Sequence, residues 1–208
     1  LTIDAKRRRL FGLGFTGYLY RFDLDRRVTT NLGRVSNWDI CRTIVCDDEG
    51  NVYGSFPTAR VWKYDARTEL VEDLPVRMPF DPMVFPTQLR NPMIDRSCDW
   101  RSVAWDPVER VIYGVTCGSR SILFRFDPRA PAERAMTALG RLCDTAFLEG
   151  QRQDVPYSPL AFALDSRARR VYFVPSARSY SVGRYAETFG SDEPHHLIVY
   201  DLARKQRI

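Results

Sequence analysis

The feature that most constrains the fold of this chain is an internal repeat of paired apolar segments. Each copy has an apolar run, a polar turn that begins at aspartate, and a second run centred on an aromatic residue. The four copies are "LTIDAKRRRLFGLG", "TIVCDDEGNVYGSF", "SVAWDPVERVIYGV" and "AFALDSRARRVYFV". Aspartate caps turns with its own side chain, and Pro107 and Gly50 suit the backbone angles of tight turns. The pattern predicts four β-hairpins.

A second segment recurs after each hairpin. Its copies are "YLYRFD", "RVWKYD", "ILFRFD" and "LIVYD", which end at Asp23, Asp65, Asp127 and Asp201. In the first three copies, two aromatic residues lie two positions apart with an arginine or a lysine between them. Successive side chains of a strand point to opposite faces. We therefore expect each aromatic pair to share one face of its strand, with the basic residue on the other.

Three copies contain a further segment, "VTTNLG", "LVEDLP" and "AMTALG", which predicts a fourth strand. Units of four antiparallel strands and about 40 to 50 residues are typical of β-propellers. The chain resembles the blades of quinoprotein-like and YVTN-like (WD40-like) propellers, most clearly in "LIVYDLARKQRI". This resemblance covers nearly the whole chain. It implies an all-β fold of about four four-stranded antiparallel blades. It gives almost no information about the activity of the protein.

These repeats predict one partial propeller domain over residues 1–208, with approximate blades at 1–37, 38–97, 98–154 and 155–208. The chain opens in an innermost strand and is expected to end after the third strand of its fourth copy. No spare outer strand is then expected to close a ring. We therefore expect an arc that belongs to a larger propeller of six to eight blades. A closed four-bladed ring of haemopexin-like size is the alternative, although the repeat motif of the haemopexin family is absent.

Three glycines, Gly12, Gly14 and Gly17, have the G-x-G-x-x-G spacing of a nucleotide-binding loop. A dinucleotide-binding loop of this kind opens a helix, whereas Tyr18 to Phe22 alternates as a strand. A protein-kinase glycine loop lies between strands, but it requires further motifs that this sequence lacks. The other copies of the repeat hold different residues at this place. The glycines are therefore predicted to serve a hairpin turn.

Composition narrows the classes of partner. The formal net charge is +5, and 28 of the 31 basic residues are arginine. Such an arginine bias is typical of a GC-rich, bacterial genome and gives little support to nucleic-acid binding. No apolar run approaches the ~18 residues that a membrane span needs. We expect neither a nucleic-acid partner nor a membrane span, and the sequence does not distinguish a cytoplasmic from a secreted or periplasmic protein.

The five cysteines are scattered without a C-x-x-C pair, which argues against a zinc ribbon or a thioredoxin-like motif. They are Cys41, Cys46, Cys98, Cys117 and Cys143. An odd number weakens a complete disulfide framework, so buried free thiols are the simpler interpretation. The sequence predicts no metal site and names no cofactor.

Loops that enter the innermost strands are the candidate ligand-binding loops. In this architecture they gather on one rim with the loops between the second and third strands, and such loops carry binding residues on a rigid scaffold. The candidate ligand-binding residues are Trp38, Asp39, Arg42, Arg60, Asp99, Trp100, Arg101, Arg120, Tyr157 and Arg178. Aromatic rings stack on sugars, and arginine holds a carboxylate or phosphate with two parallel hydrogen bonds. Alternatively, the tryptophans pack between blades while the charged residues pair with one another.

The segment "PSARSYSVGRYAETFGSDEPHH" is a long insertion that contains both histidines. Connections of this length are usually functional or disordered, and this one is the predicted lid. If the protein is an enzyme, His195 and Tyr185 are the candidate catalytic residues. Propeller lyases of the oligogalacturonate or ulvan type draw histidines from several blades, whereas this sequence keeps its two in one loop. Adjacent histidines point to opposite faces of an extended chain, so they do not predict a shared metal.

The aspartate-led turns are expected at the opposite rim, together with a basic fringe. Its members are "KRRR" at 6–9, Arg26, Arg27, Arg67, Arg129, Arg167, Arg169, Arg170, Arg204 and Lys205. Such a fringe could attract an anionic partner through its electric field. The simpler interpretation is a set of solvated turn tips.

The function predicted from these observations is a ligand- or partner-binding propeller module that recognises an anionic or carbohydrate-like molecule at the strand-entry rim. The alternative is a propeller-type polysaccharide lyase or another carbohydrate-active enzyme. A quinone- or metal-dependent dehydrogenase ranks third because no cofactor pocket is identifiable. Exposed sheet edges at both ends predict a cover of further blades, a neighbouring domain or another subunit.

Overall fold

The structure is a computed structural model of the chain. It describes residues 1–14, 16–35, 43–55, 60–79, 100–116, 122–141, 154–181, 184–186 and 197–208. Among these residues, no helix has the length and the apolar run that a membrane crossing needs.

Four antiparallel sheets, which we call blades 1 to 4, follow one another along the chain, and consecutive strands are neighbours throughout blades 1 to 3. Blade 1 contains β1 (Thr2–Asp4), β2 (Arg9–Leu13), β3 (Tyr18–Asp23) and β4 (Val28–Arg34). Blade 2 contains β5 (Val45–Cys46), β6 (Val52–Ser55), β7 (Arg60–Tyr64) and β8 (Val71–Arg77). Blade 3 contains β9 (Trp100–Asp106), β10 (Val111–Thr116), β11 (Ile122–Phe126) and β12 (Met136–Arg141), with the one-turn helix α1 (Ala132–Ala135) before β12.

Blade 4 differs from the others in its strands. It contains β13 (Asp154–Asp165), β14 (Arg170–Ser181), β16 (Ile198–Asp201) and β17 (Gln206–Arg207), and β15 (Arg184–Ala186) also pairs with β14. The expectation that the chain ends after the third strand of this blade was wrong. A polar pair of residues forms β17 through main-chain pairing with Tyr200 and Asp201 at the outer edge, so an apolar pattern does not reveal it.

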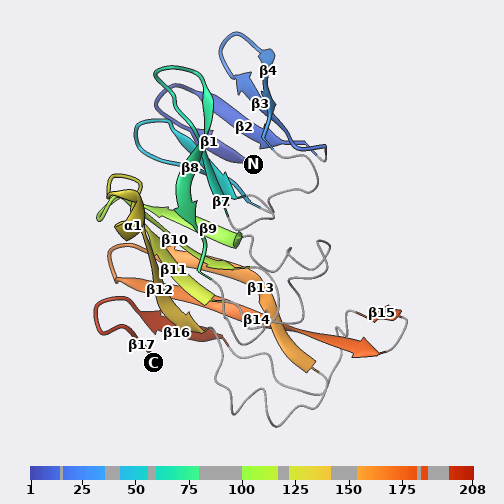
Figure 1. Cartoon of the computed structure of the whole chain (residues 1–208), viewed down its shortest axis with the longest axis vertical. Coiled ribbons are helices and arrows are strands. Elements are labelled where there is room, and N and C mark those ends of the chain that lie inside the picture. The colour runs from blue at the N-terminus through green and yellow to red at the C-terminus, as the bar shows by residue number, and fades with distance from the viewer. Residues whose placement is uncertain are drawn as a thin grey trace.

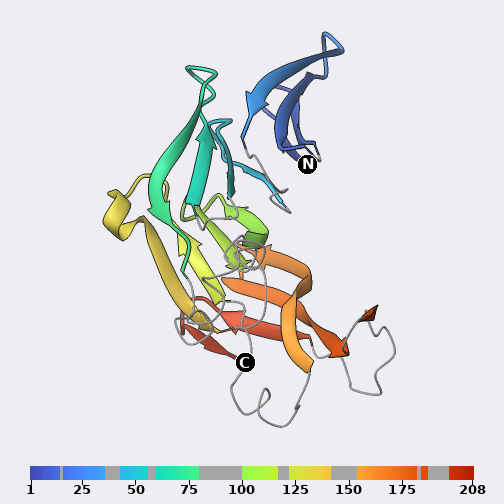
Figure 2. The same cartoon turned by 45° about the vertical axis from the view of Figure 1, so that its right-hand side comes forward.

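The sheets stand side by side as an arc. The first strands of successive blades are neighbours, β1 with β5, β5 with β9, and β9 with β13. Figures 1 and 2 show blade 1 and blade 4 at opposite ends of the arc. One apolar cluster joins blades 1, 2 and 3, and a second joins blades 3 and 4. The prediction of an all-β propeller of four antiparallel blades is confirmed; the total number of blades stays a prediction.

The predicted aspartate-led turns are present in all four blades. Each carboxylate accepts hydrogen bonds from backbone amides two to four residues further along. These aspartates are Asp4, Asp23, Asp47, Asp65, Asp106, Asp127, Asp165 and Asp201. In the turn between the first two strands, the residue four positions after the aspartate has a left-handed backbone in blades 1, 3 and 4. These residues are Arg8, Arg110 and Arg169. In blade 2 the left-handed residue is Gly50, three positions after Asp47. The repeat is therefore one of backbone geometry as well as of sequence.

Aromatic residues of the third strand lie over glycines of the second. Trp62 pairs with Gly54 and Phe124 with Gly114. A Cβ added at Gly54 would lie 2.1 Å from Cζ2 of Trp62, so the ring occupies the space that a side chain would need. Gly12 holds the same register position opposite Tyr20 in blade 1. The ring of Tyr20 does not occupy the space beside Gly12, where an added Cβ would meet only Cδ2 of Leu1. The predicted hairpin is confirmed by the antiparallel β2–β3 pair.

Ring contacts join neighbouring blades. Phe11 of blade 1 lies 5.3 Å from Tyr64 of blade 2, measured between ring centroids. Tyr53 of blade 2 lies 5.9 Å from Phe126 of blade 3. The third-strand aromatic residues Tyr64 and Phe126 therefore face the preceding blade. On the same face of blade 1, Tyr20 is 36% exposed, so the four blades form an arc rather than a closed ring.

Candidate functional site

The described part of the strand-entry rim is centred on Trp100, the first residue of β9. Its backbone N–H donates to Oγ of Ser55 (3.0 Å) and its ring Nε1–H donates to the carbonyl of Thr43 (2.7 Å), both in the chain of blade 2. The ring is stacked on Phe124 with centroids 6.1 Å apart, and Trp100 is fully buried. The sequence makes Trp100 a candidate for stacking on a ligand, but its enclosed ring instead joins blades 2 and 3.

The structure places two further candidates on the rim side of their blades. Arg60 begins β7, and its guanidinium pairs with Asp73 on β8 at 2.9 Å. Arg101 follows Trp100 on β9 and is half-buried, and its carbonyl accepts a hydrogen bond from Oγ1 of Thr43 at 3.4 Å. The side chain of Arg60 is thus paired with the neighbouring strand, while this contact of Arg101 is made by its backbone. Their predicted roles in ligand binding stay predictions.

Three more candidates lie on blade 4. The strands β13 and β14 have 12 residues each and form a ribbon that extends past the blade (Figure 1). Its register pairs Tyr157 with Ser176 and Arg178 with Val155, and a register shift separates this part from the blade proper after Tyr157. Tyr185, on β15, pairs with Tyr180. The ribbon therefore brings Tyr157, Arg178 and Tyr185 into one structural unit.

The remaining candidates lie outside the described residues. They are Trp38, Asp39, Arg42, Asp99, Arg120 and His195. Their assignment to the rim therefore stays a prediction. Within the part of the chain that is described, no three histidine, cysteine, aspartate or glutamate side chains are placed to hold a metal ion.

One cysteine, Cys46, is described, and it is buried and free. Burial, and then the negative charge of nearby Asp4 and Asp47, raise the pKa of its thiol to about 12. A thiol with so high a pKa is protonated at neutral pH and is a poor nucleophile or metal ligand. The other four cysteines lie outside the described residues.

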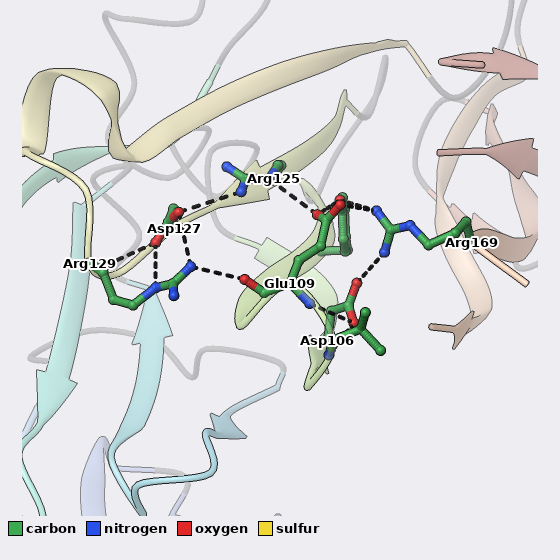
Figure 3. Close-up of polar contacts among 8 residues, drawn as sticks. Asp106, Glu109, Arg125, Asp127, Arg129 and Arg169 are labelled. Carbon is green, nitrogen blue, oxygen red and sulfur yellow. Dashed lines mark hydrogen bonds and ion pairs between the residues drawn. The ribbon is translucent and has the colours of Figure 1, made fainter. Parts of the chain in front are cut away.

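The opposite rim, where the aspartate-led turns lie, contains a polar cluster between blades 3 and 4. Arg169 of blade 4 donates from Nη1 to Oδ2 of Asp106 at 2.5 Å, and from Nη2 to Oε1 of Glu109. Its guanidinium also donates to the hydroxyl of Tyr113 at 3.2 Å, and that hydroxyl donates to Oε2 of Glu109 at 2.6 Å. Asp106 is fully buried. Figure 3 shows Arg169 reaching across from its own blade to these acceptors.

Two further arginines complete the cluster on the side of blade 3. Arg125 lies 3.6 Å from Oε2 of Glu109 and 3.4 Å from Oδ2 of Asp127, measured from its Nε and Nη2. Arg129 donates from Nη2 to the carbonyl of Glu109 at 2.9 Å and lies 3.2 Å from Oδ1 of Asp127. Three guanidinium groups thus face three carboxylates, and their formal charges cancel. The cluster is a neutral clamp between blades rather than a site for an anion.

The electrostatics of the clamp follow from this arrangement. Burial by itself raises the pKa of Glu109, but the hydrogen bond from Tyr113 and the charge of Arg169 outweigh it and lower the pKa overall. Burial raises the pKa of Tyr113, and its hydrogen bond to Glu109 raises it further. The pKa of Arg169 is also raised, because its hydrogen bonds to Tyr113 and Asp106 outweigh the effect of burial. All three groups therefore keep their roles across the neutral range.

Other arginines of the basic fringe are paired in the same way. Arg7 pairs with Asp4 at 3.0 Å, and Arg8 pairs with Asp25 at 2.6 Å. Arg110 of blade 3, which the sequence did not assign to this fringe, pairs with Glu49 of blade 2. The sequence placed Arg7 and Arg8 at one rim, but it gave no sign of which carboxylate each would meet. That pairing depends on how neighbouring blades are rotated against each other.

No protein-family model matches the chain, and no curated protein matches its sequence. Solved structures do resemble its fold. The extracellular domain of a candidate one-component system from B. thetaiotaomicron is 14% identical with a TM-score of 0.52, and the match covers 95% of this chain and 21% of that one. A candidate 6-phosphogluconolactonase from Bacteroides uniformis is 11% identical with a TM-score of 0.50, over 99% of this chain and 56% of that one.

An oligogalacturonate lyase in complex with manganese is also similar, at 11% identity and a TM-score of 0.50, over 93% of this chain and 42% of the lyase chain. At such low identities the likeness shows the fold alone. In each case this chain spans less than two thirds of the other protein.

Proposed function

We propose that the chain is a ligand-binding propeller module whose strand-entry rim recognises an anionic carbohydrate. The observation that carries this proposal is the ribbon of blade 4. It extends blade 4 at this rim; its register pairs Tyr157 with Ser176 and Arg178 with Val155, and Tyr185 lies on the adjoining strand. Tyrosine and arginine are residues that contact sugar rings and carboxylates.

The contrast between the two rims supports the choice of the strand-entry rim. At the turn rim, the arginines of the blade 3–blade 4 clamp meet carboxylates of equal number. A ligand that bound there would have to displace ion pairs that join the blades. The ribbon lies at the other rim, where binding leaves those contacts intact.

Binding of a uronate polymer tests the proposal. Polygalacturonate is the probe, and isothermal titration calorimetry measures its affinity for the intact chain and for the variants Arg178→Ala and Tyr157→Ala. Loss of the charged contact is expected to weaken binding by about tenfold or more, since a hydrogen bond to a charged group contributes about 1.5–3 kcal/mol. The Tyr157 variant is expected to weaken binding less.

Arg67→Ala is the matched control, because it removes an arginine from a turn at the opposite rim. It is expected to bind the probe as well as the unchanged protein does. Equal affinity of the Arg178 and Arg67 variants would overturn the proposed site. Absence of binding by the folded, unchanged protein would overturn the proposed ligand class.

Incubation of the protein with polygalacturonate also tests the alternative activity, that of a polysaccharide lyase. β-Elimination from a uronate polymer creates an unsaturated sugar that absorbs in the ultraviolet. A slow rise in that absorbance, abolished by Tyr185→Phe, would favour the lyase. Binding without such a rise is what the proposed module predicts.

A further inference from the structure

Some arginines of the turn rim have a carboxylate partner, and others have none. Arg7, Arg110 and Arg169 each form an ion pair. Four exposed arginines lie in the turns that lead to the fourth strands of blades 1 to 3; we call them the outer-turn arginines, and they are Arg26, Arg27, Arg67 and Arg134. Among the residues that the structure describes, no carboxylate lies within ion-pair distance of these four. Their charges are therefore not neutralised by ion pairs within the described fold.

Most carboxylates of the same turns are engaged elsewhere. The aspartate that opens each turn accepts hydrogen bonds from backbone amides of that turn. Asp25 pairs with Arg8, and Glu69 pairs with Arg21. In α1, Glu133 is exposed beside an outer-turn arginine. Four arginines thus share these turns with one exposed carboxylate that has no ion pair in the described structure, so the turns present a positive surface.

Three aliphatic side chains are exposed at the same rim. Val28 is 54% exposed and Leu70 is 67% exposed. Both follow directly on a left-handed residue, Arg27 in blade 1 and Glu69 in blade 2, so the repeat gives them one position. Val108, in the first turn of blade 3, is 63% exposed. Blades 2 and 3 each have a blade on either side, so Leu70 and Val108 are exposed in the presence of both neighbours.

The charged and the aliphatic side chains lie at one end of the blades. In an antiparallel meander, the turns after the first and the third strand lie at the same end of the sheet. Figure 1 shows the turn between β3 and β4, the turn between β7 and β8, and α1 along the upper and left margin of the arc. Positive charge together with protruding aliphatic side chains suits the surface of an anionic bilayer. The charges are attracted by its negative potential, and the aliphatic groups enter the boundary between headgroups and acyl chains.

A nucleic acid would also be attracted by these arginines. Proteins that bind single strands add aromatic rings on which the bases stack, and none of the eight turns of the four blades contains an aromatic residue. The exposed aliphatic side chains would add nothing to contacts with phosphates. Their presence beside the arginines therefore favours a lipid surface as the partner.

We propose that the turn rim binds the surface of an anionic lipid bilayer, through the outer-turn arginines and the three exposed aliphatic side chains. The protein then lies on the membrane without crossing it. The strands of each blade run away from the bilayer, so the strand-entry rim and its ribbon face the solution. This inference is independent of the ligand proposed above, because the two surfaces lie at opposite ends of the blades.

Sedimentation of the unchanged protein with lipid vesicles is the first test. The protein is expected to bind vesicles that contain phosphatidylglycerol and not vesicles of phosphatidylcholine alone. Binding is expected to weaken as the salt concentration is raised, because salt screens the attraction between exposed charges. Absence of binding to the phosphatidylglycerol vesicles, or equal binding to both kinds, would overturn the proposal.

Charge variants of one blade test which rim meets the vesicle. Arg67→Gln is expected to weaken binding to phosphatidylglycerol vesicles about fivefold, the share of one basic residue near an anionic surface. Arg77→Gln is the matched control, since Arg77 is exposed at the other end of β8 in the same blade. It is expected to bind like the unchanged protein. Equal binding by the two variants would show that the overall charge, and not the turn rim, attracts the protein, and would overturn the proposal.

An aliphatic variant separates a lipid surface from other polyanions. Leu70→Ser is expected to weaken vesicle binding at least about threefold, because its side chain no longer leaves water for the acyl boundary. Leu1→Ser is the control, since Leu1 is 84% exposed directly before β1 and away from the turns. Thermal unfolding establishes that each variant is folded. A loss with Arg67→Gln but none with Leu70→Ser would indicate a purely electrostatic surface, as for a nucleic acid, and would overturn the lipid proposal.

Discussion

The face of blade 1 that carries Tyr20 and the same face of blade 2 follow one sequence plan, yet they have different surroundings. Trp62, the counterpart of Tyr20, is fully buried between blades, whereas Tyr20 is 36% exposed. Both lie opposite a glycine of the second strand. The comparison shows that the repeat encodes a face made for a neighbouring blade, and that burial depends on whether the neighbour is there.

The largest expected difference between the two faces comes from truncating these rings. Trp62→Ala is expected to lower the free energy of unfolding by about 3–5 kcal/mol, because it leaves a cavity between blades 1 and 2. Tyr20→Ala is expected to lower it by less than about 1 kcal/mol, as for a surface position. Urea unfolding measures both values. Equal losses would contradict the packing of Trp62 between blades.

Glycine substitutions sharpen the same comparison. Gly54→Ala would place a Cβ 2.1 Å from the ring of Trp62, which is fixed between blades. We expect a loss of about 3 kcal/mol, the upper end of the range for overpacking. Gly12→Ala would place its Cβ 3.0 Å from Cδ2 of Leu1, an exposed side chain that can move. Thermal unfolding should therefore separate the Gly54 variant from the unchanged protein, and leave the Gly12 variant close to it.

Arginines at equivalent left-handed positions should also differ. Arg169→Ala leaves the buried carboxylate of Asp106 without its guanidinium partner, and we expect a loss of about 1–3 kcal/mol. Arg8 pairs with Asp25 where both side chains are 61% exposed, and its replacement by Ala is expected to leave the urea midpoint unchanged. A destabilised Arg8 variant with a stable Arg169 variant would reverse the comparison.

Acid should loosen the interface between blades 3 and 4 through Glu109. The folded protein lowers the pKa of this carboxyl from its usual value of 4.5. A depressed folded pKa contributes stability that is fully present above the unfolded value and is lost as the pH falls through the folded value. Unfolding free energies measured between pH 7 and pH 3 should therefore fall less steeply in Glu109→Gln than in the unchanged protein. Identical slopes would contradict the role of Glu109 in the clamp.

The fold was predictable because its signals are local. Aspartate-led turns and aromatic residues at alternate positions depend on a few neighbouring residues, and both predicted series, from Asp4 and from Asp23, cap turns in the structure. The short outer strand β17 was missed because a polar edge strand lacks that alternation. The extra length of β13 and β14 was missed for a related reason, since a register shift after Tyr157 interrupts the pattern.

The candidate site was less predictable because it depends on contacts between blades. The sequence placed Trp100 at a rim, but it did not show that Thr43 and Ser55 of the preceding blade enclose it. From the sequence, Arg169 was one of many arginines expected at turn tips. In the structure it reaches across the interface between blades 3 and 4 to the buried carboxylate of Asp106. The sequence did contain one signal for this cluster. It is an acidic residue four positions before a tyrosine in the same hairpin, as for Glu109 and Tyr113.

The coupling between Phe11 and Tyr64 tests the central claim that adjacent sheets pack face to face with their aromatic residues between them. A double-mutant cycle with Phe11→Ala and Tyr64→Ala, followed by urea unfolding, measures the coupling. The ring contact at 5.3 Å predicts a coupling of about 0.5–1.5 kcal/mol, while Phe11 and Tyr20, which lie on opposite faces of blade 1, should show none. Zero coupling between Phe11 and Tyr64, with coupling between Phe11 and Tyr20, would contradict the radial arrangement of the blades.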